Sequence, residues 1–283
     1  MLPSKIIDCR SDTVTKPSPA MMAAMVEAEL GDDVYREDPT VLQLEKEVAA
    51  LLDKEAGLFV PTGTMGNLIS CMVHCWNRGA EIILGDKSHI HVYEQGSIAQ
   101  FGGIHHRTIK NEDNGTFDVN GIYDLFRSSA PMDPHSPITS LVCIENSHNK
   151  CGGRAVPISW LQAVGQACKD LNLPLHCDGA RLFNTAAALG VPAKELVRDC
   201  ASVSVCLSKG LGTPVGSVIV GSHEFIRKAI RVRKALGGGM RQVGILAAAG
   251  LYGIRHNIDR LVLDHLHAKQ VARGIQYNIH TYT

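Results

Sequence analysis

The fold of this chain is decided by the stretch SVSVCLSKGLGTPVGSVIV, residues 202–220. Residues 202–207 and 216–220 are short, apolar and rich in β-branched side chains, which is typical of strands buried on both faces of a sheet. Lys209 follows the first of these strands and stands beside a glycine-rich turn. A lysine whose ammonium simply reaches solvent is the common alternative. Motifs elsewhere in the chain decide between a solvated lysine and a functional one.

The glycines of this stretch do not form a dinucleotide-binding loop. The segment GLGTPVG places Val215 where the pattern G-x-G-x-x-G needs its third glycine. A strand-like segment follows the glycines, whereas the dinucleotide motif opens a helix. Both the spacing and the context therefore argue against a nucleotide site here.

The composition is that of an ordinary globular protein. The chain has 283 residues, 45% hydrophobic and 20% charged, and Lys+Arg and Asp+Glu both number 28. A net charge of zero gives no broad field to attract nucleic acid or an anionic membrane, so we expect neither partner. The N-terminus MLPSKIIDCRSD resembles neither a secretory signal nor an Arg-rich presequence, and no apolar run has the length of a membrane span. We expect a cytosolic protein, with a mitochondrial location left open.

Nine cysteines without a signal peptide predict reduced thiols, most of them buried as small apolar side chains. In CMVHC, Cys71, His74 and Cys75 lie within about one helical turn. No second Cys or His pair follows at the spacing of a structural zinc site, so helix packing is favoured over metal binding. The histidines of HIH, residues 89–91, and of HH, residues 105–106, are equally weak as metal ligands, and we expect no metal.

Strand-like and helix-like segments alternate along the chain. One helix is predicted with Ser18 as its cap and Pro19 at its first position. A second is predicted to begin near Asp38 and Pro39, because Val41, Leu44, Val48 and Leu51 mark one apolar face. The alternation predicts an α/β fold with a mostly parallel sheet covered by helices, whose ligands collect outside the carboxyl ends of the strands. Further strands are expected in 56–63, 81–86, 138–146 and 173–179, and further helices in 64–75, 159–171, 222–236 and from about 240.

Polar groups follow three of these strands. The strand in LPLHCDG delivers Asp178, and the 31 residues between Asp178 and Lys209 are about what one βαβ crossover needs. In FVPTGTMGN a strand turns through Thr62, Gly63 and Thr64 into a helix, whose N-terminal N–H groups can bind a phosphate. We therefore expect a lysine, an aspartate and a phosphate cup at one edge of the sheet.

This combination points to pyridoxal 5′-phosphate. The amine of a lysine can bind the cofactor covalently, and an aspartate beside the pyridine nitrogen keeps that nitrogen protonated, which makes the ring an electron sink. A flat side chain must also hold the ring, and His89, just past the strand EIILGD, is placed for it. Each element alone has a structural explanation as a turn, a cap or a core histidine. Their order and spacing together favour the cofactor over the solvated lysine.

Eight motifs carry a resemblance to a known family. The sequence resembles the low-specificity L-threonine aldolases, which are fold-type-I enzymes that use pyridoxal 5′-phosphate, over about residues 7–275. This resemblance implies a mostly parallel, seven-stranded-type sheet flanked by helices, with the small C-terminal domain largely missing. The motifs are, in order, DCRSDTVTKPS, GDDVYREDPT, FVPTGTMGN, SHIHVYE, ENSHNKCGGR, HCDGARLFN, CLSKGLGTPVGS and LGGGMRQ.

The resemblance also implies a role for each site residue. Lys209 would be the Schiff-base lysine, Asp178 the partner of the pyridine nitrogen and His89 the ring-stacking histidine. Ser11 and Arg181 would bind the substrate carboxylate, Arg181 through its two-pronged guanidinium. The remaining expected contacts are Thr62, Gly63 and Thr64 to the phosphate, Lys234 and Arg241 to the phosphate of a neighbouring subunit, His148 near the substrate hydroxyl, and Tyr93 and Glu94 as looser candidates for the pocket wall.

The expected reaction is the cleavage of L-threonine or L-allo-threonine to glycine and acetaldehyde by a homodimer or homotetramer. His89 or His148 would take the hydroxyl proton, because imidazole titrates near neutral pH, and a bound water stays open as a third base. Two alternatives stay open. One is a truncated subunit that binds the cofactor without catalysis, and the other is a racemase or transaminase on the same fold.

We expect two regions along the chain. Residues 1–248 would form the large cofactor-binding domain, and residues 249–283 the start of a truncated small domain. Family members carry a C-terminal domain of about a hundred residues, an ordinary domain size, which supplies a further arginine for the substrate carboxylate. We therefore expect this chain to bind the cofactor but to turn over weakly.

Overall fold

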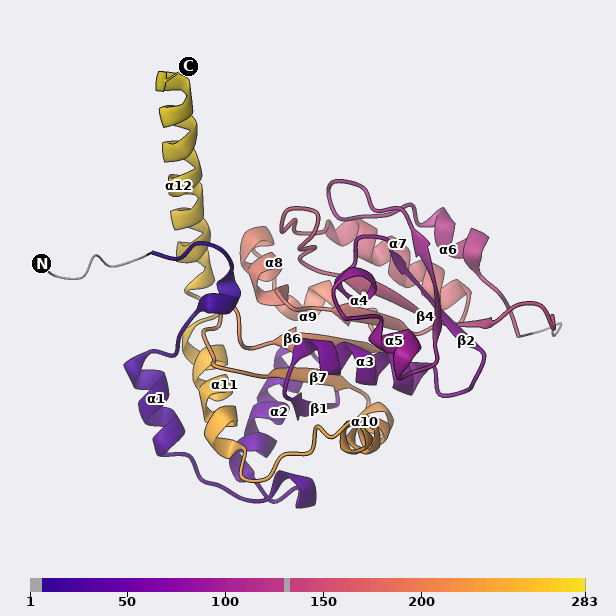
Figure 1. The fold of residues 1–283 in the computed structure, drawn as a ribbon, viewed down its shortest axis with the longest axis horizontal. Helices are drawn as coiled ribbons and strands as arrows, with labels where there is room; N and C mark the ends of the chain where they lie inside the picture. Colours follow the sequence, from indigo (N-terminus) through magenta and orange to yellow (C-terminus); the bar gives the residue numbers. More distant parts are fainter. Residues whose placement is uncertain (1–6, 130–132, 283) are drawn as a thin grey trace, which may run out of the picture.

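Figure 1 shows a computed structural model of the chain, which describes residues 7–129 and 133–282. One seven-stranded sheet runs through it in the order β1-β7-β6-β5-β4-β2-β3. β7 is antiparallel to both of its neighbours, and the other pairs are parallel, which confirms the expected mostly parallel sheet. The strands are β1 (Ala56–Val60), β2 (Ala80–Gly85), β3 (His105–Ile109), β4 (Ile138–Glu145), β5 (Leu175–Asp178), β6 (Ser202–Cys206) and β7 (Ser217–Gly221).

The two strands of the opening motif lie side by side in the sheet, with β7 next to the edge strand β1 and β6 on its inner side. Every residue of β6 and β7 is buried, as the unbroken apolar pattern predicts for strands covered on both faces. Six of the seven strands match the predicted segments, with β2 and β7 each extending one residue beyond. The exception is β3, an edge strand whose sequence HHRTI is polar and mostly accessible, so that it gives no apolar signal.

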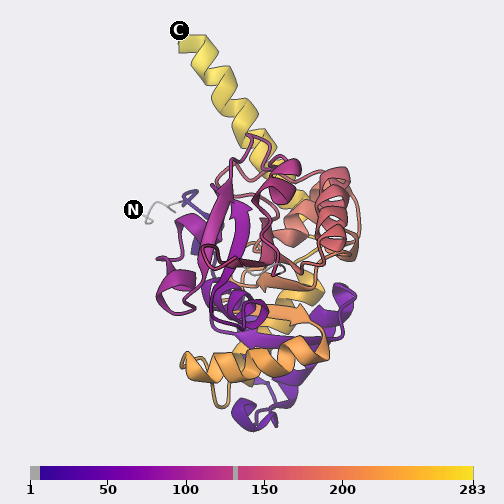
Figure 2. The same cartoon turned by 90° about the vertical axis from the view of Figure 1, so that its right-hand side faces the viewer.

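Helices cover both faces of the sheet, as Figure 1 and the rotated view in Figure 2 show. One apolar cluster packs α2, α7, α8 and α11 against one face, and two others pack α3, α5 and α10 against the opposite face. The helices are α1 (Pro19–Val26), α2 (Pro39–Leu51), α3 (Gly63–His74), α4 (His89–Val92), α5 (Ser97–Gln100), α6 (Asn120–Leu125), α7 (Ile158–Asp170), α8 (Leu182–Leu189), α9 (Ala193–Leu196), α10 (His223–Ala235), α11 (Gly244–His256) and α12 (Leu261–Tyr282), with short 3-10 turns at Asp12–Val14 and Asp33–Tyr35.

The helix starts follow the predicted caps. Ser18 Oγ accepts a hydrogen bond from Met21 N at 3.2 Å, and proline occupies the first position of both α1 and α2. Asp38 caps α2, and its carboxylate also accepts a bond from Gly244 N at 2.9 Å. That second bond joins the start of α2 to the start of α11, so the cap also fixes tertiary packing.

The last two helices, α11 and α12, contain or follow the domain boundary predicted at residue 248. α11 runs without a break across residue 249 and packs against α1 and α2. α12 contacts α8 near its start and then projects from the body of the molecule, as both views show. The division at residue 248 and the missing C-terminal domain stay predictions. Among residues 7–129 and 133–282, no helix combines the length and the apolar composition that a bilayer crossing requires.

The cysteines behave as predicted for a reduced protein. All nine are free, and Cys9 alone is exposed. Cys71 and Cys75 are buried in the apolar cluster beneath α3, while His74 bonds instead to Ser202. The motif CMVHC therefore serves helix packing, as expected.

Candidate active site

Charged side chains gather at the carboxyl ends of the central strands. β4 ends at Glu145 and β5 at Asp178, and the two residues are direct partners in the register of the sheet. Asp178 is in turn paired with Ser204 of β6, whose strand leads to Lys209. Adjacent parallel strands therefore bring the predicted aspartate and lysine to one edge, where ligands of α/β sheets bind.

Asp178 is buried, and each of its two carboxylate oxygens accepts one hydrogen bond. Its Oδ1 accepts a bond from Ala180 N at 3.1 Å, and its Oδ2 accepts one from Asn67 Nδ2 at 2.9 Å. Asn67 lies on α3 and its Nδ2 also donates to Glu94 Oε1 at 2.8 Å. The aspartate is thus held by two N–H donors, one of them from a helix that packs over the strand.

Lys209 lies in the turn after β6 and is half-buried. Its carbonyl accepts a hydrogen bond from Thr15 Oγ1 at 2.9 Å, which ties the N-terminal segment to this turn. Its ammonium lies beside the thiol of Cys206, the last residue of β6, and burial raises the pKa of that thiol. The lysine is therefore anchored at the strand end and is not free in solvent.

The start of α3 is where the phosphate cup is predicted. Thr62 caps the helix, and its Oγ1 accepts a bond from Met65 N at 3.1 Å. Within the described part of the chain, the N–H groups of Gly63 and Thr64 have no hydrogen-bond partner. A Cβ at Gly63 would meet Cys206 Sγ at 2.7 Å, so only glycine lets the helix start this close to the lysine-bearing strand.

His89 begins α4 and is held at two points. Its Nδ1 lies 2.9 Å from Glu94 Oε1, and its N–H donates to Glu145 Oε2 at 2.7 Å. The bond to Glu94 raises the pKa of His89. Ligand atoms of His89, Glu94 and Asp178 all lie within 4.8 Å of one another, so the ring stands next to the aspartate.

Two buried carboxylates surround this histidine. Burial raises the pKa of Glu94, and burial together with the nearby charge of Asp178 raises the pKa of Glu145 to about 7. Sequence reasoning considered Glu94 only for the pocket wall and gave Glu145 no role. The one signal for Glu145 is the pattern that revealed Asp178, a polar residue at the end of an apolar strand.

His148 is buried just past the end of β4. Neither of its ring nitrogens has a hydrogen-bond partner within the residues that the structure describes. Burial lowers the pKa of His148, so the ring is neutral near pH 7, and it lies within electrostatic range of Asp178. Both nitrogens of this buried imidazole are therefore available to a hydrogen-bond partner from outside the described residues.

Arg181, which is predicted to bind the substrate carboxylate, is paired with Asp12 in the structure. Arg181 Nε and Nη2 each donate to an oxygen of Asp12 at 2.7 Å, in the two-pronged geometry that suits a carboxylate. Ser11 caps the short turn that carries Asp12, and it lines a groove of about 1460 Å³ between the N-terminal segment and α12. Sequence reasoning gave Asp12 no role.

Tyr93 lies at the rim of the site. It is exposed, its ring centroid is 5.5 Å from that of His89, and its hydroxyl accepts a bond from Lys150 Nζ at 3.2 Å. Its place is compatible with the looser prediction that it lines the pocket.

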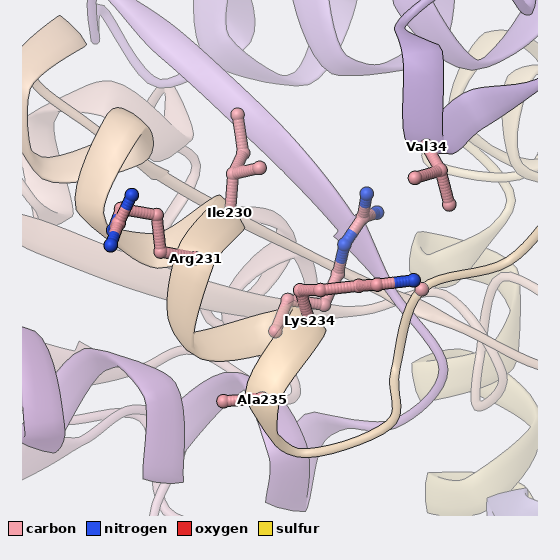
Figure 3. Close-up of a pocket in the computed structure, with 7 residues that line it drawn as sticks. Val34, Ile230, Arg231, Lys234 and Ala235 are labelled. Carbon is pink, nitrogen blue, oxygen red and sulfur yellow. The ribbon is translucent and has the colours of Figure 1, made fainter.

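Lys234 lines a pocket to which Lys209, Asp178 and His89 do not contribute, and Arg241 pairs with an acid. Figure 3 shows Lys234 extending from α10 toward Val34 in a surface pocket of about 470 Å³. Arg241 Nη1 donates to Asp32 Oδ2 at 2.8 Å. Contact with a neighbouring subunit's phosphate stays a prediction for both residues.

The residues present fit pyridoxal 5′-phosphate. The unpartnered N–H groups of Gly63 and Thr64 stand at the positive end of a helix of 12 residues, as a phosphate requires. Asp178 offers a buried carboxylate to a protonated ring nitrogen, and His89 offers a flat ring beside it. Lys209 supplies the amine. The phosphate cup and the lysine meet at Cys206, which touches both.

Comparison with known proteins agrees with this assignment. The family model described as beta-eliminating lyase matches residues 8–279. A probable low-specificity L-threonine aldolase 2 of Arabidopsis thaliana is 54% identical over 271 residues, which are 96% of this chain and 76% of that protein. A low specificity L-threonine aldolase of Escherichia coli (strain K12) is 45% identical over 96% of this chain and 79% of that protein.

Solved structures share the fold. The crystal structure of a putative L-allo-threonine aldolase from Listeria monocytogenes matches with a TM-score of 0.77 at 22% identity, over 92% of this chain and 71% of that one. The threonine aldolase of Leishmania major matches with a TM-score of 0.78 at 20% identity, over 96% of this chain and 78% of that one.

The fold and the site thus define a lyase of fold type I that uses pyridoxal 5′-phosphate. Within that class, the chain belongs to the family of the low-specificity L-threonine aldolases.

Proposed function

We propose that this protein cleaves L-threonine and L-allo-threonine to glycine and acetaldehyde. The proposal rests on one observation. In a chain of this family, Lys209, Asp178, His89 and the free N–H groups of α3 converge at the carboxyl ends of β5 and β6. The cofactor supplies an electron sink that stabilises the charge left at Cα when the Cα–Cβ bond breaks.

The residues divide the remaining work. The N–H groups at the start of α3 hold the phosphate, Asp178 keeps the ring nitrogen protonated, and His89 holds the face of the ring. The substrate hydroxyl loses its proton as the bond breaks, and Cα gains a proton before glycine leaves. The reaction therefore balances without an oxidant or a reductant.

His148 is the better candidate for the base. A base must be neutral to accept the hydroxyl proton, and burial lowers the pKa of His148 and so keeps it neutral. The pKa of His89 is raised by Glu94, and its Nδ1 is already engaged by that carboxylate. A bound water stays the third possibility.

Arg181 would receive the substrate carboxylate, with Ser11 at its side. Asp12 presents two oxygens to the guanidinium in the geometry that a substrate carboxylate would adopt. A substrate must therefore displace Asp12 or add to the guanidinium N–H groups that Asp12 leaves open. If the substrate displaces Asp12, then Asp12 competes with the substrate carboxylate for Arg181.

Other functions receive less support. A cofactor-binding subunit without catalysis, or a racemase or transaminase on the same fold, is not favoured by relatives that are named threonine aldolases at 45–54% identity. We also propose a homodimer or homotetramer, in which Lys234 and Arg241 would approach the phosphate of a neighbouring subunit. Light scattering of the purified protein would measure its mass. A cytosolic location stays a prediction from the sequence.

The cleavage is tested with purified protein, added cofactor and L-threonine, with acetaldehyde measured by reduction with NADH and alcohol dehydrogenase. We expect glycine and acetaldehyde in equal amounts, no activity in Lys209→Ala, and full activity in the matched control Lys46→Ala on the exposed face of α2. Borohydride reduction and peptide mapping should place the cofactor on Lys209. A label on another lysine, or no acetaldehyde at full cofactor occupancy, would contradict the proposal.

A further inference from the structure

A continuous chain of buried polar groups leads away from the back of Asp178. Asn67 Oδ1 lies 3.2 Å from His176 Nε2, His176 Nδ1 lies 2.8 Å from Ser202 Oγ, and Ser202 Oγ lies 2.8 Å from His74 Nε2. Asn67, His176 and Ser202 are at most 1% exposed. Sequence reasoning assigned no role to Asn67, His176 or Ser202, and it placed His74 in a motif for which helix packing was favoured.

The secondary structure explains why the groups meet. His176 and Asp178 are two residues apart on β5 and share the face that α3 covers, while Ser202 is the register partner of His176 on β6. Asn67 and His74 are seven residues apart on α3, about two turns, and so face the same side. One helix and two strands therefore assemble the whole chain.

The direction of every hydrogen bond in the chain can be worked out from Asn67. Its terminal group lies 2.9 Å from Asp178 Oδ2 and 2.8 Å from Glu94 Oε1. Two carboxylate oxygens require donors, so the NH₂ group must face them and use both of its hydrogens. Asn67 Oδ1 is then an acceptor, and His176 must carry its proton on Nε2.

The remaining links follow from this tautomer. Burial lowers the pKa of His176 to about 3 and that of His74 to about 4, so each ring is neutral and has one N–H. With its proton on Nε2, His176 accepts at Nδ1, and Ser202 must donate to it. Ser202 Oγ then accepts from His74 Nε2–H. All four side chains donate in the same direction, toward Asp178.

We propose that Asn67 and His176 are positioning residues, which hold the Asp178 carboxylate toward the cofactor's ring nitrogen through a one-way hydrogen-bond chain from His74. Aligned donors polarise one another, which strengthens the last bond of the chain, the one that Asp178 accepts. The inference rests on the proposed role of Asp178 toward the cofactor. It adds a chain of four residues, Asn67, His176, Ser202 and His74, that leads up to the Asp178 carboxylate.

Other charged groups also act on Asp178. His89, Glu94 and Glu145 lie within electrostatic range of it, and Ala180 N bonds its second oxygen. Glu94 accepts one of the two hydrogens of the Asn67 amide and so helps to orient it, but none of these groups forms a hydrogen bond with His176. The tautomer of His176 therefore reports on the groups that bond its ring, which are Asn67 Oδ1 on one side and Ser202 on the other.

The first test reads that tautomer in the unloaded protein. Histidine labelled with nitrogen-15 gives long-range proton–nitrogen spectra, in which His176 is assigned from its loss in His176→Gln. We expect a neutral ring with its proton on Nε2 across the neutral pH range, with or without cofactor. A proton on Nδ1, or a charged ring, would overturn the inference whatever the activity of the protein.

The second test reads the cofactor by its absorption spectrum and its dissociation constant. His176→Phe fills the ring volume without a donor, and His176→Gln retains a donor toward Asn67. We expect His176→Phe to weaken cofactor binding on the order of tenfold, the size expected for weakening one bond to a charged group, and to shift the absorption maximum. His176→Gln should restore both to within a few-fold of the parent protein.

Ser70→Ala is the matched control. Ser70 is a fully buried residue of α3 between Asn67 and His74, and within residues 7–129 and 133–282 its hydroxyl bonds only the carbonyl of Gly66. Its loss should lower thermal stability without changing the absorption maximum. If His176→Phe behaves as Ser70→Ala does, the chain is merely structural and the proposal is wrong. If the tautomer is as expected but threonine is not cleaved, the proposed function fails and the hydrogen-bond chain stands.

Discussion

Replacing Asp178 by asparagine tests the cofactor assignment most directly, because the change keeps the shape and removes the charge. Both oxygens of Asp178 accept bonds from N–H donors, Ala180 N at 3.1 Å and Asn67 Nδ2 at 2.9 Å. An asparagine has only one acceptor, so its NH₂ group must face one of these donors. The variant therefore loses one hydrogen bond, and its NH₂ group faces the N–H of either Ala180 or Asn67.

The structure sets the size of the effect. Losing a bond to a charged group costs about 1.5–3 kcal/mol, and a buried donor without a partner costs about 1–3 kcal/mol. The loss is offset in part, because Asp178 and burial together raise the pKa of Glu145 to about 7, and removing the charge relieves that repulsion. We expect a folded protein whose free energy of unfolding falls by about 1–3 kcal/mol.

Turnover should fall further than cofactor content. The phosphate is held at the start of α3, away from the substitution, so saturating cofactor should still load the variant. Losing about 1.5–3 kcal/mol of stabilisation at the ring nitrogen slows cleavage roughly tenfold to a hundredfold or more. The measurement is kcat for threonine at equal cofactor occupancy, with occupancy read from absorbance. Equal losses of cofactor and turnover would refute the assignment and make Asp178 a structural residue.

Three further outcomes are expected. Asp12→Asn removes the charge that pairs with Arg181, so the substrate carboxylate should reach the guanidinium more easily. KM for threonine should then fall on the order of tenfold with little change in kcat. A higher KM would mean that Asp12 positions the arginine. The pKa of Glu145 is raised from 4.5 to about 7 on folding, so the folded protein loses stability as pH rises from about 4.5 to about 7. Glu145→Gln should reduce this dependence of the melting temperature on pH in the unloaded protein. An unchanged dependence would contradict the raised pKa. Gly63→Ala would push α3 away from Cys206 and should weaken cofactor binding on the order of tenfold. The double variant with Cys206→Ala removes the contacting sulfur and should bind the cofactor as the parent protein does. If the double variant binds as weakly as Gly63→Ala, the contact with Cys206 is not the cause.

Sequence patterns predicted most of the fold because its signals are local. Six strands are apolar runs, and Ser18, Asp38 and Thr62 each cap a helix where a short polar side chain precedes a helical pattern. β3 was missed because an edge strand needs no apolar run. The short helices α4, α5 and α9 were missed because a helix of four residues has no measurable periodicity.

In the candidate site, too, only the residues with a local sequence signal could be predicted. Lys209 and Asp178 stand at the ends of apolar strands, which the sequence reveals, and their convergence follows from parallel topology. The partners that set their chemistry are distant in sequence. Asp12 reaches Arg181 across 169 residues and Asn67 reaches Asp178 across 111, and no local pattern marks either pair.

One helix controls both ends of the proposed cofactor site. The phosphate cup begins at Gly63, and Asn67, which orients Asp178, follows four residues later on the same face of α3. Small residues let this helix lie close to the sheet, since a Cβ at Gly66 would meet Ser204 Oγ at 2.7 Å and Ile219 Cγ2 at 2.9 Å. A displacement of α3 by a few tenths of an ångström would therefore loosen the phosphate contacts and lengthen the bond to Asp178 together. Phosphate binding and ring electronics are thus two consequences of how closely α3 packs on β6 and β7.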